Sequence, residues 1–523
     1  MAIQLFSWSE TAVFPVLSVM TFIPLLAVII ISGFKSETLT IKVSFTATIV
    51  NVLLGIYLLI IFDSETAGIH LSERVELLSM TYRVGVDGTN ILFIPLTAVV
   101  SLLALTYTRI TRHAHDTLLI SCLLGYEGIL IGAFSALNSL QFWLWSALEL
   151  LPVTFLTIYA GTGLNRRRII FRILQFWIFG LAMTLTGFLL LSFGLEKNGM
   201  PLTFDWLALK QHNVSLDNEA LIFMLLFYGF SVRMPLFPFH GWLPMIAEQG
   251  TVASAAIFLV GLKLGIYAVI RFILPLVPGA AEQWAGFVVN LGLIGIFYGA
   301  LLALMQINIR RLMAFAVISH TGMLVIGIFS FNDYALEGVL LLSVAYGLAT
   351  AGMLFSVGLI YERSRTAFLP RLGGLFETNS TIAILFLISS LSTMVMPGTP
   401  GFDAAHLLIE GTIEEHGWFV AVAILVGNVL AAGFLLRAFQ RIFIANPKRA
   451  HQPFSTSHHP VVIERIITVV ICLLLIGTGF YTTPWLKYID QDASAIGEHY
   501  PEHGSHHANE PIPESIDNPG DQP

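Results

Sequence analysis

Long apolar runs separated by short polar stretches recur along the whole chain. A helix needs about 20 mostly apolar residues to cross a bilayer, because the hydrocarbon core is about 30 Å thick. The pattern therefore predicts an all-α, polytopic membrane protein with about fourteen transmembrane helices. The spans are expected at 14–34, 41–62, 89–109, 117–136, 139–161, 169–194, 219–244, 251–274, 284–306, 310–331, 335–361, 376–412, 417–444 and 461–486.

Prolines interrupt two of these apolar segments. Span seven contains MPLFPFHGWLP (234–244), and span twelve contains MPGTPGFDAAH (396–406). A proline at membrane depth frees backbone carbonyls, which is tolerated only where protein or a water-filled cavity satisfies them. Two broken segments five helices apart are typical of an inverted-repeat transporter core. The sequence thus predicts two inverted five-helix repeats, spans 4–8 and 9–13, with broken helices 7 and 12.

This pattern also suggests a division of the chain. The expected units are the first three spans (1–110), the first half (111–275), the second half (276–445), a loop with the last span (446–489) and a tail (490–523). The tail is acidic and rich in His and Pro, so we expect it to be disordered. No fixed scaffold holds its histidines, and no metal site is predicted there.

Composition excludes several classes of protein. The chain is 56% hydrophobic and 11% charged, whereas a soluble protein has roughly 25% charged residues. Its net charge of −7 comes with no basic patch, so nucleic-acid binding is not expected. Cys122 and Cys472 lie apart within apolar segments, and neither a cysteine cluster motif nor a dinucleotide fingerprint occurs. We therefore expect no redox cofactor and no metal in this chain, and no catalytic redox site.

Basic residues predict the orientation in the membrane. Lys and Arg gather in cytoplasmic loops of membrane proteins. Here they follow odd-numbered spans: Lys35, Lys42, Arg109, Arg112, Arg166, Arg167, Arg168, Arg310, Arg311, Arg363, Arg365, Arg371, Lys448 and Arg449. Those loops are expected in the cytoplasm, which puts both termini on the outer side, in a bacterial inner membrane.

Ionisable residues cluster around the first break. Arg233 precedes it, His240 lies within it, and Lys263 follows in span eight. A charge inside a membrane helix costs about 2.5–3.5 kcal/mol on insertion scales, so such residues commonly mark an ion or proton pathway. Arg271, near a helix end, fits local pairing or snorkelling instead. Lys263 has apolar neighbours on both sides and favours the pathway.

Several motifs now support a resemblance to a known family. They are YEGILIGAFSALNSLQFWLW (126–145), ELLPV (149–153), MPLFPFHGWLP (234–244), GLKLGIYAVIRF (261–272), SHTGM (319–323) and PGTPGF (397–402). In this order and spacing, they resemble the antiporter-like membrane subunits of complex I. The likeness is to the chain M or subunit 4 type, which includes the NDH proteins of cyanobacteria and chloroplasts, and it covers roughly residues 85–445. Mrp-type antiporter subunits are more distantly similar.

The resemblance implies proton transfer along buried charged residues. In the family, a Glu–Lys pair on spans five and seven is linked through a span-eight Lys and central histidines to a Lys or Glu on span twelve. Glu127 matches a family acidic position, Lys263 the central lysine, and His320 a central histidine. Such a relay requires that each displaced charge change the proton affinity of the next group.

The first half departs from the family pattern at its ion pair. Arg233 stands where the family usually has Lys, and a guanidinium does not deprotonate in proteins. The family glutamate of span five falls at Ala147, while Glu149 matches an acidic position of the cyanobacterial and chloroplast branch. Two residues on a continuous helix lie about 200° apart. We therefore expect Glu149 to face away from the usual position.

The second half departs at two further positions. Tyr346 stands in place of the second central histidine, and Ala405 in place of the acidic residue of helix twelve. Asp403, His406 and Glu410 lie near one helical face and form a candidate replacement exit. The candidate pathway residues are therefore Glu127, Glu149, Arg233, His240, Lys263, His320, Tyr346, Asp403, His406 and Glu410.

The leading interpretation is a non-redox, proton- or cation-translocating subunit of a complex I-like NADH/quinone oxidoreductase assembly. NADH, flavin, iron–sulfur clusters and quinone would then bind in partner subunits. One alternative is a membrane subunit of an energy-coupled inorganic-carbon uptake complex, which the altered relay positions suit. A second is an Mrp-like cation/proton antiporter. The partners discriminate among the three, because each assembly has different neighbouring membrane subunits.

Overall fold

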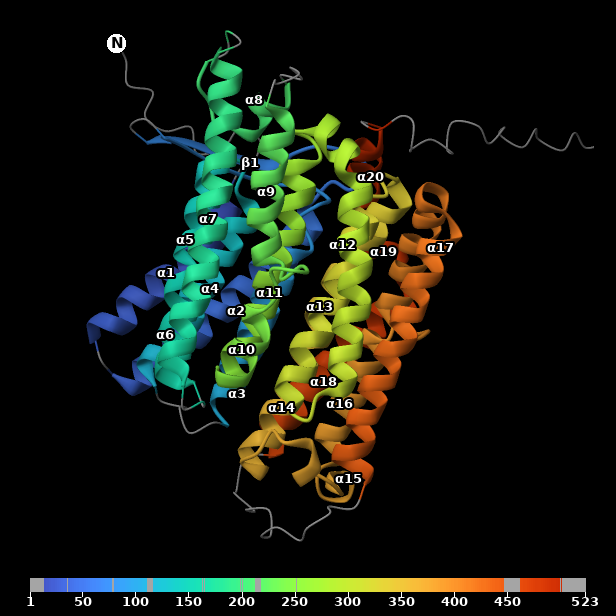
Figure 1. Cartoon of the computed structure of the whole chain (residues 1–523). Helices are drawn as coiled ribbons and strands as arrows, with labels where there is room; N and C mark the ends of the chain where they lie inside the picture. Colours follow the sequence, from blue (N-terminus) through green and yellow to red (C-terminus); the bar gives the residue numbers. More distant parts are fainter. Residues whose placement is uncertain are drawn as a thin grey trace, which may run out of the picture.

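The computed structural model is a bundle of membrane-length helices (Figure 1). It describes residues 14–500 except 35, 78–79, 111–115, 162, 164, 198, 200, 212–217, 251, 446–460 and 499. Most of the predicted tail therefore lies outside the described residues.

The helices follow the predicted spans closely. In chain order they are α1 Val16–Phe34, α2 Glu37–Ile61, α3 Phe93–Thr108, α4 Thr117–Ser135, α5 Ser139–Leu148, α6 Leu150–Ala160, α7 Arg166–Lys197, α8 Trp206–Gln211, α9 Glu219–Arg233, α10 Trp242–Gln249, α11 Val252–Ala268, α12 Pro278–Met305, α13 Ile309–Ile328, α14 Asp333–Ser364, α15 Leu375–Thr378, α16 Ser380–Thr393, α17 Pro400–Phe439, α18 Val461–Phe480, α19 Thr483–Lys487 and α20 Asp490–Gly497. In the described part of the chain, ten helical segments are long and apolar enough to cross a membrane. The other predicted spans coincide with α3, α11 and the two broken helices.

Both predicted breaks are present. The first separates α9, which ends at Arg233, from α10, which begins at Trp242. The second separates α16 from α17, and Gly398 there has a φ of +84°, which favours glycine. The long α17 reverses direction at Gly417, whose φ of 75° and ψ of 176° are not helical. Its two arms therefore correspond to predicted spans twelve and thirteen.

A β-hairpin was not predicted. Strands β1 (His70–Leu77) and β2 (Met80–Val86) pair antiparallel, where the sequence analysis placed only a loop. Alternate residues of β2 point to the interior, with Val84 and Val86 fully buried, which is the period-two pattern of a half-buried strand. Strand β1 lies at the same end of the bundle as α20, and α15 lies at the opposite end (Figure 1).

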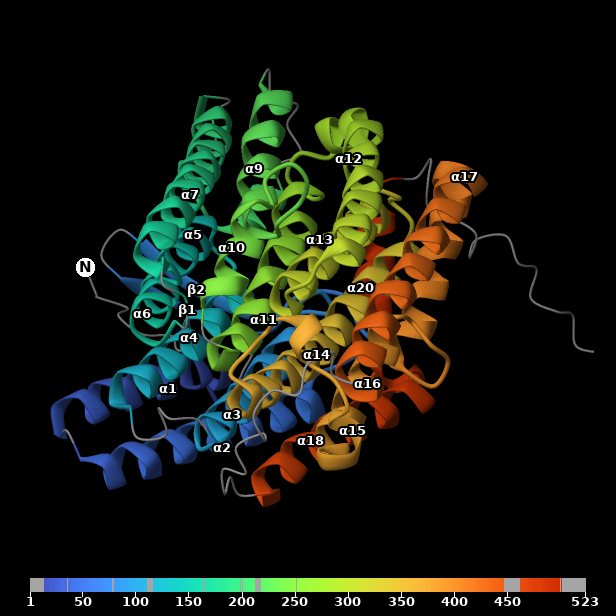
Figure 2. The ribbon, with the colours of Figure 1, turned by 60° about the horizontal axis from the view of Figure 1, so that its bottom comes forward.

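The two halves meet in the centre of the bundle. Helix α11 of the first half packs against α3, α4 and α14, and α14 belongs to the second half. Helices α1 and α2 form a lateral pair beside α4 (Figure 2). The residues of α13 and α14 within the membrane are almost all buried. This contact between α11 and α14 places the ionisable residues of one half next to those of the other.

Candidate proton pathway

The strongest buried ion pair of the first half joins Glu149 to Arg233. Glu149 lies between α5 and α6 and is fully buried, and its Oε2 faces Nη2 of Arg233 at the end of α9. The hydroxyl of Tyr126, on α4, donates to Oε1 of the same carboxylate. Three helices thus converge on one carboxylate, and each of its oxygens has a contact of its own.

The expectation that Glu149 faces away from the usual position was wrong. It rested on a continuous helix through 147–149. Pro152 has no N–H to give to the carbonyl of Leu148, and α5 ends there, with α6 beginning only at Leu150. Extrapolating 100° per residue across this junction is not valid. Glu149 therefore pairs with Arg233 although the family position, Ala147, carries no charge.

Close packing leaves no room for another side chain beside the pair. A Cβ on Gly261, in α11, would lie 2.8 Å from Oε1 of Glu149 and would also clash with the Tyr126 hydroxyl. Real Cβ atoms do not approach oxygen so closely, so a glycine is required here. Because Gly261 is two residues before Lys263, the same helix passes the pair and carries the central lysine.

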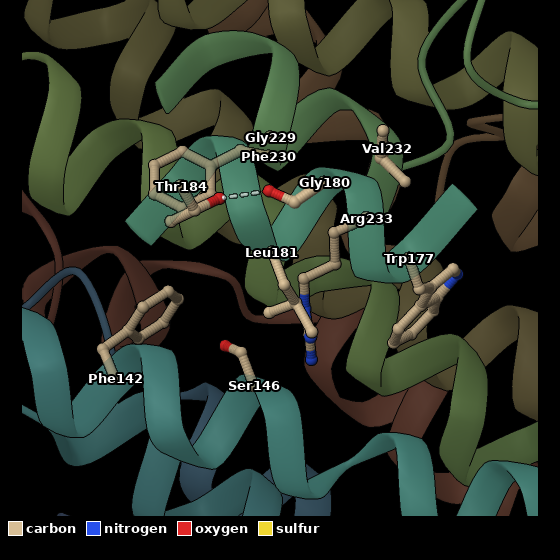
Figure 3. A pocket seen from close by; sticks show the side chains of 10 residues that line it. All are labelled: Phe142, Ser146, Trp177, Gly180, Leu181, Thr184, Gly229, Phe230, Val232 and Arg233. Atoms are coloured by element: carbon tan, nitrogen blue, oxygen red, sulfur yellow. Dashed lines mark hydrogen bonds between the residues drawn. The ribbon is translucent and has the colours of Figure 1, made fainter. Parts of the chain in front are cut away.

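A cavity of about 20 Å³ adjoins Arg233. It lies between α5, α7 and α9, and Figure 3 shows the Arg233 and Ser146 side chains approaching each other across it. Trp177 flanks the guanidinium, with 5.4 Å from Cζ to the ring centre. The Ser146 hydroxyl has no hydrogen-bond partner among the described residues. The space is sufficient for one water molecule, which could join the two groups.

Lys263 lies in the centre of the structure. Its side chain is buried, and its Nζ lies 5.6 Å from the ring centre of Tyr346 on α14. The Tyr346 ring stacks on His320 of α13, with 4.4 Å between the ring centres and 18° between the planes. In the described part of the chain, no carboxylate lies within ion-pair distance of Lys263. These three predicted residues therefore form one group.

The polar atoms of this central group are mostly unpaired. Both ring nitrogens of His320 and the hydroxyl of Tyr346 lack a hydrogen-bond partner among the described residues. Buried polar atoms without partners commonly contact water. His240, the other predicted histidine, is also buried but lies apart, edge-on to Tyr298 at 4.9 Å between ring centres. The structure does not join His240 to the central group by any contact.

The charged residues of helix twelve occupy its outside. Asp403 accepts a hydrogen bond of 2.5 Å from Thr482. His406 and Glu410 lie 3.6 Å apart, with side chains 71% and 50% exposed. Ala405, where the family has its acidic residue, is buried. Sequence spacing put 403, 406 and 410 near one face, but it did not tell that this face is turned away from the bundle interior.

Buried hydroxyls, and no charges, occur on the inner side of helix twelve. Ser389, Ser390 and Ser392 of α16 are fully buried, as is Ser343 of α14. The side-chain oxygens of all four lack hydrogen-bond partners within the described structure. Helices α14 and α16 pack against each other. The sequence analysis missed these serines, for which the one available signal was three hydroxyl residues together in an apolar span.

Glu127 belongs to a different contact. It is fully buried in α4, and its Oε1 accepts a hydrogen bond of 2.9 Å from the side chain of Asn51 in α2. Asn51 was not a predicted site residue. Its only sequence signal was an amide in the middle of an otherwise apolar span.

Arg271 has a structural role. Two of its guanidinium nitrogens donate to Asp87 at 2.6 and 2.7 Å, and one also donates to Thr89 at 3.0 Å. A bidentate pair of this kind fixes the end of the α11 segment to the residues that follow β2. The expectation of local pairing for Arg271 is confirmed. Among the described residues, no group of three or more His, Cys, Asp or Glu side chains is arranged to hold a metal.

Comparison with known proteins follows this geometry. Residues 117–431 match the transmembrane family of the NADH:quinone oxidoreductases and Mrp antiporters. The chain belongs to this family. The subunit M of NADH-quinone oxidoreductase from Rickettsia typhi is 31% identical over 444 residues, which cover 82% of this chain and 88% of that protein. The subunit M of Pseudomonas aeruginosa is 30% identical, covering 81% and 83%.

Solved structures share the fold of this family member. A chain of respiratory complex I from Thermus thermophilus superposes with a TM-score of 0.80 at 23% identity, covering 92% of this chain and 99% of that one. A chain of the Mrp complex from Dietzia sp. gives 0.81 at 16% identity, with coverages of 93% and 98%. The antiporter-like fold and the membrane location predicted from the sequence are confirmed.

Proposed function

We propose that this chain carries protons across the membrane as a non-redox subunit of a complex I-like NADH/quinone oxidoreductase assembly. Its family membership supports the assembly, and one observation carries the transport role. Ionisable side chains, namely Glu149 with Arg233, then Lys263, then His320 with Tyr346, occupy the interior of the bundle from the first half into the second. Groups of this kind in a membrane interior are retained where they serve ion movement.

Arg233 acts as a fixed positive charge in this proposal. A guanidinium holds its proton, so the arginine changes the energy of its neighbours only by pairing with Glu149 or separating from it. When the pair is closed, the positive charge is largely neutralised, and a proton on Lys263 is less repelled. When the pair opens, the field of Arg233 reaches Lys263 and favours release of that proton towards His320 and Tyr346.

The second half would conduct through hydroxyls and water. The serines of α16 and Ser343 offer donors and acceptors along the face where Ala405 supplies none. A hydroxyl passes on a proton only with a water chain, so this route depends on hydration. Asp403, His406 and Glu410 remain candidates for release at the surface of the helix, because His406 and Glu410 are exposed.

The remaining features of the proposal concern partners and orientation. Redox cofactors and quinone would bind in partner subunits, and other membrane subunits and the lipid bilayer would surround the chain. The arginine-rich loops place the end that carries α15 in the cytoplasm, so the β-hairpin and α20 face the outside with both termini. The division at 110, 275 and 445 into N-terminal spans and two halves accompanies this topology.

A second function is favoured by the four altered positions. Ala147, Arg233, Tyr346 and Ala405 replace titratable family residues or, for Arg233, a lysine that can deprotonate. A subunit of an inorganic-carbon uptake complex would tolerate such changes. Purification of the native protein in mild detergent, with mass spectrometry of its partners, separates the two. NADH- and quinone-module subunits favour the first function, and a carbonic-anhydrase-like partner favours the second.

Lys263→Met tests the transport role. We expect proton uptake into inverted vesicles to fall at least about tenfold, because an uncharged side chain interrupts the central group. Assembly should survive, since the substitution removes a costly buried charge. Arg437→Met is the matched control, because that side chain is exposed and bonds only to the carbonyl of Leu304. Undiminished uptake in the Lys263 variant would refute transport through this chain.

A further inference from the structure

Asn51 connects three helices through one side chain. It is fully buried in α2, and its amide nitrogen donates both to Oε1 of Glu127 in α4, at 2.9 Å, and to the backbone carbonyl of Met20 in α1, at 3.1 Å. An amide NH₂ has two N–H groups. Both are therefore used, one for the carboxyl group and one for the backbone.

Pro24 explains why the Met20 carbonyl needs this donor. In an α-helix, the carbonyl of residue 20 accepts from the N–H of residue 24. Proline has no N–H, so Pro24 inside α1 leaves that carbonyl free at membrane depth. A free backbone carbonyl in such surroundings costs several kcal/mol unless a side chain or water satisfies it. Asn51 supplies the missing donor.

The carbonyl fixes which way round the amide of Asn51 lies. A carbonyl oxygen only accepts, so turning the amide by 180° would bring its oxygen against the Met20 oxygen. The NH₂ group must then stay on the side of Met20 and Glu127. Oε1 of Glu127 consequently always faces a donor, and a proton on that oxygen would point at another hydrogen.

We propose that Asn51 is a positioning residue that makes Oε2 the proton-carrying oxygen of Glu127. Oε2 is buried and has no hydrogen-bond partner among the described residues, so it is the oxygen open to an incoming proton. The inference rests on the proposed proton transport, for which Glu127 would be a loading site on α4. Its neighbour Tyr126 lies about 100° around the helix and bonds Glu149. One helix thus presents Glu127 to α1 and α2 and Tyr126 to the ion pair.

Tight packing supports a fixed geometry at this site. A Cβ added to Gly128, the residue after Glu127, would lie 2.7 Å from the backbone oxygen of Thr21 and 3.1 Å from the Pro24 ring. Helices α1 and α4 therefore touch at the turn that carries the proline. The acceptor freed by Pro24 cannot drift away from Glu127 without separating these helices.

Infrared spectroscopy of the purified full-length protein provides the test. The C=O stretch of protonated Glu127 is assigned as the band that disappears in Glu127→Gln. We expect Asn51→Leu to move and broaden this band, because the carboxyl group loses its fixed donor, and to lower proton uptake about tenfold, the equivalent of one hydrogen bond to a charged group. Thr48→Val is the matched control, because Thr48 is equally buried in α2 but bonds only backbone of its own helix.

A double variant separates positioning from stability. Pro24→Ala restores the N–H that the Met20 carbonyl needs, so Asn51→Leu with Pro24→Ala should regain thermal stability. Its band should stay broadened and its uptake low, because Glu127 still lacks the donor. Recovery of both band and uptake, or an unchanged band in Asn51→Leu, would overturn the inference. If the native protein moved no protons, the proposed function would fail, while the band would still report on Asn51.

Discussion

The two halves of this protein solve the same problem with different side chains. In the first half, a broken helix ends at Arg233, which forms a buried ion pair with Glu149 under the hydroxyl of Tyr126. In the second half, the corresponding break has Ala405 on its inner side and keeps its charges outside, where His406 is 71% exposed. Similar backbone breaks therefore do not imply similar chemistry.

The difference shows what each half can contribute. A closed ion pair can store a change of field, because separating two buried charges alters the energy of every charge nearby. Buried hydroxyls hold no net charge and can only conduct through water. We therefore assign the coupling step to the first half and passive conduction to the second, with the contact between α11 and α14 as the junction.

The largest expected effect concerns the ion pair. Arg233→Met leaves Glu149 buried without its charge partner, so we expect the free energy of unfolding to fall by about 3–5 kcal/mol. Adding Glu149→Gln should restore most of that loss, since the pair is then replaced by neutral groups. Thermal unfolding in detergent measures both variants. A double variant no more stable than the single one would show that the pair is not a coupled unit.

The second prediction addresses conduction in the second half. Changing Ser389, Ser390 and Ser392 together to Ala should reduce proton uptake about tenfold, because an apolar surface no longer holds a water chain. Thr393→Val is the control, since its hydroxyl donates to the carbonyl of Ser389 within the same helix. Equal uptake in the triple variant and the control would remove the hydroxyl route.

The smallest expected effect lies at the outer end, away from both halves. Asp492 of α20 accepts from the backbone N–H groups of Gly68 and Gly88, and burial, with a contribution from Asp87, raises its pKa from 3.8 to about 6. The folded state therefore holds this proton more tightly than the unfolded chain does. Raising the pH from about 4 to about 6 must remove stability through this group, and the loss is complete above that range.

Asp492→Asn isolates this contribution. The asparagine cannot titrate, so the fall in thermal midpoint between pH 4.5 and pH 7 should be a few degrees smaller than in the native protein. Each midpoint is measured in the same detergent, which cancels the titration of other groups. An identical pH dependence in the two proteins would mean that the carboxylate of Asp492 is not strained by its surroundings.

The sequence predicted the spans and both breaks because apolar length and proline are local signals. The pairing of Glu149 was mispredicted because Pro152 ends a helix that was assumed to continue. Asn51 and the serines were missed because their importance depends on neighbours from other helices. The exposure of His406 could not be predicted either, since spacing shows which residues share a face but not what that face meets.

One measurement tests the assignment of coupling to the first half most directly. Proton uptake is compared in inverted vesicles that carry Glu149→Gln or Glu410→Gln, with equal assembly checked for each variant. Both substitutions remove one carboxylate next to a broken helix, one inside the bundle and one 50% exposed on its surface. We expect Glu149→Gln to lose uptake at least about tenfold and Glu410→Gln to retain most of it. The reverse order would contradict the account.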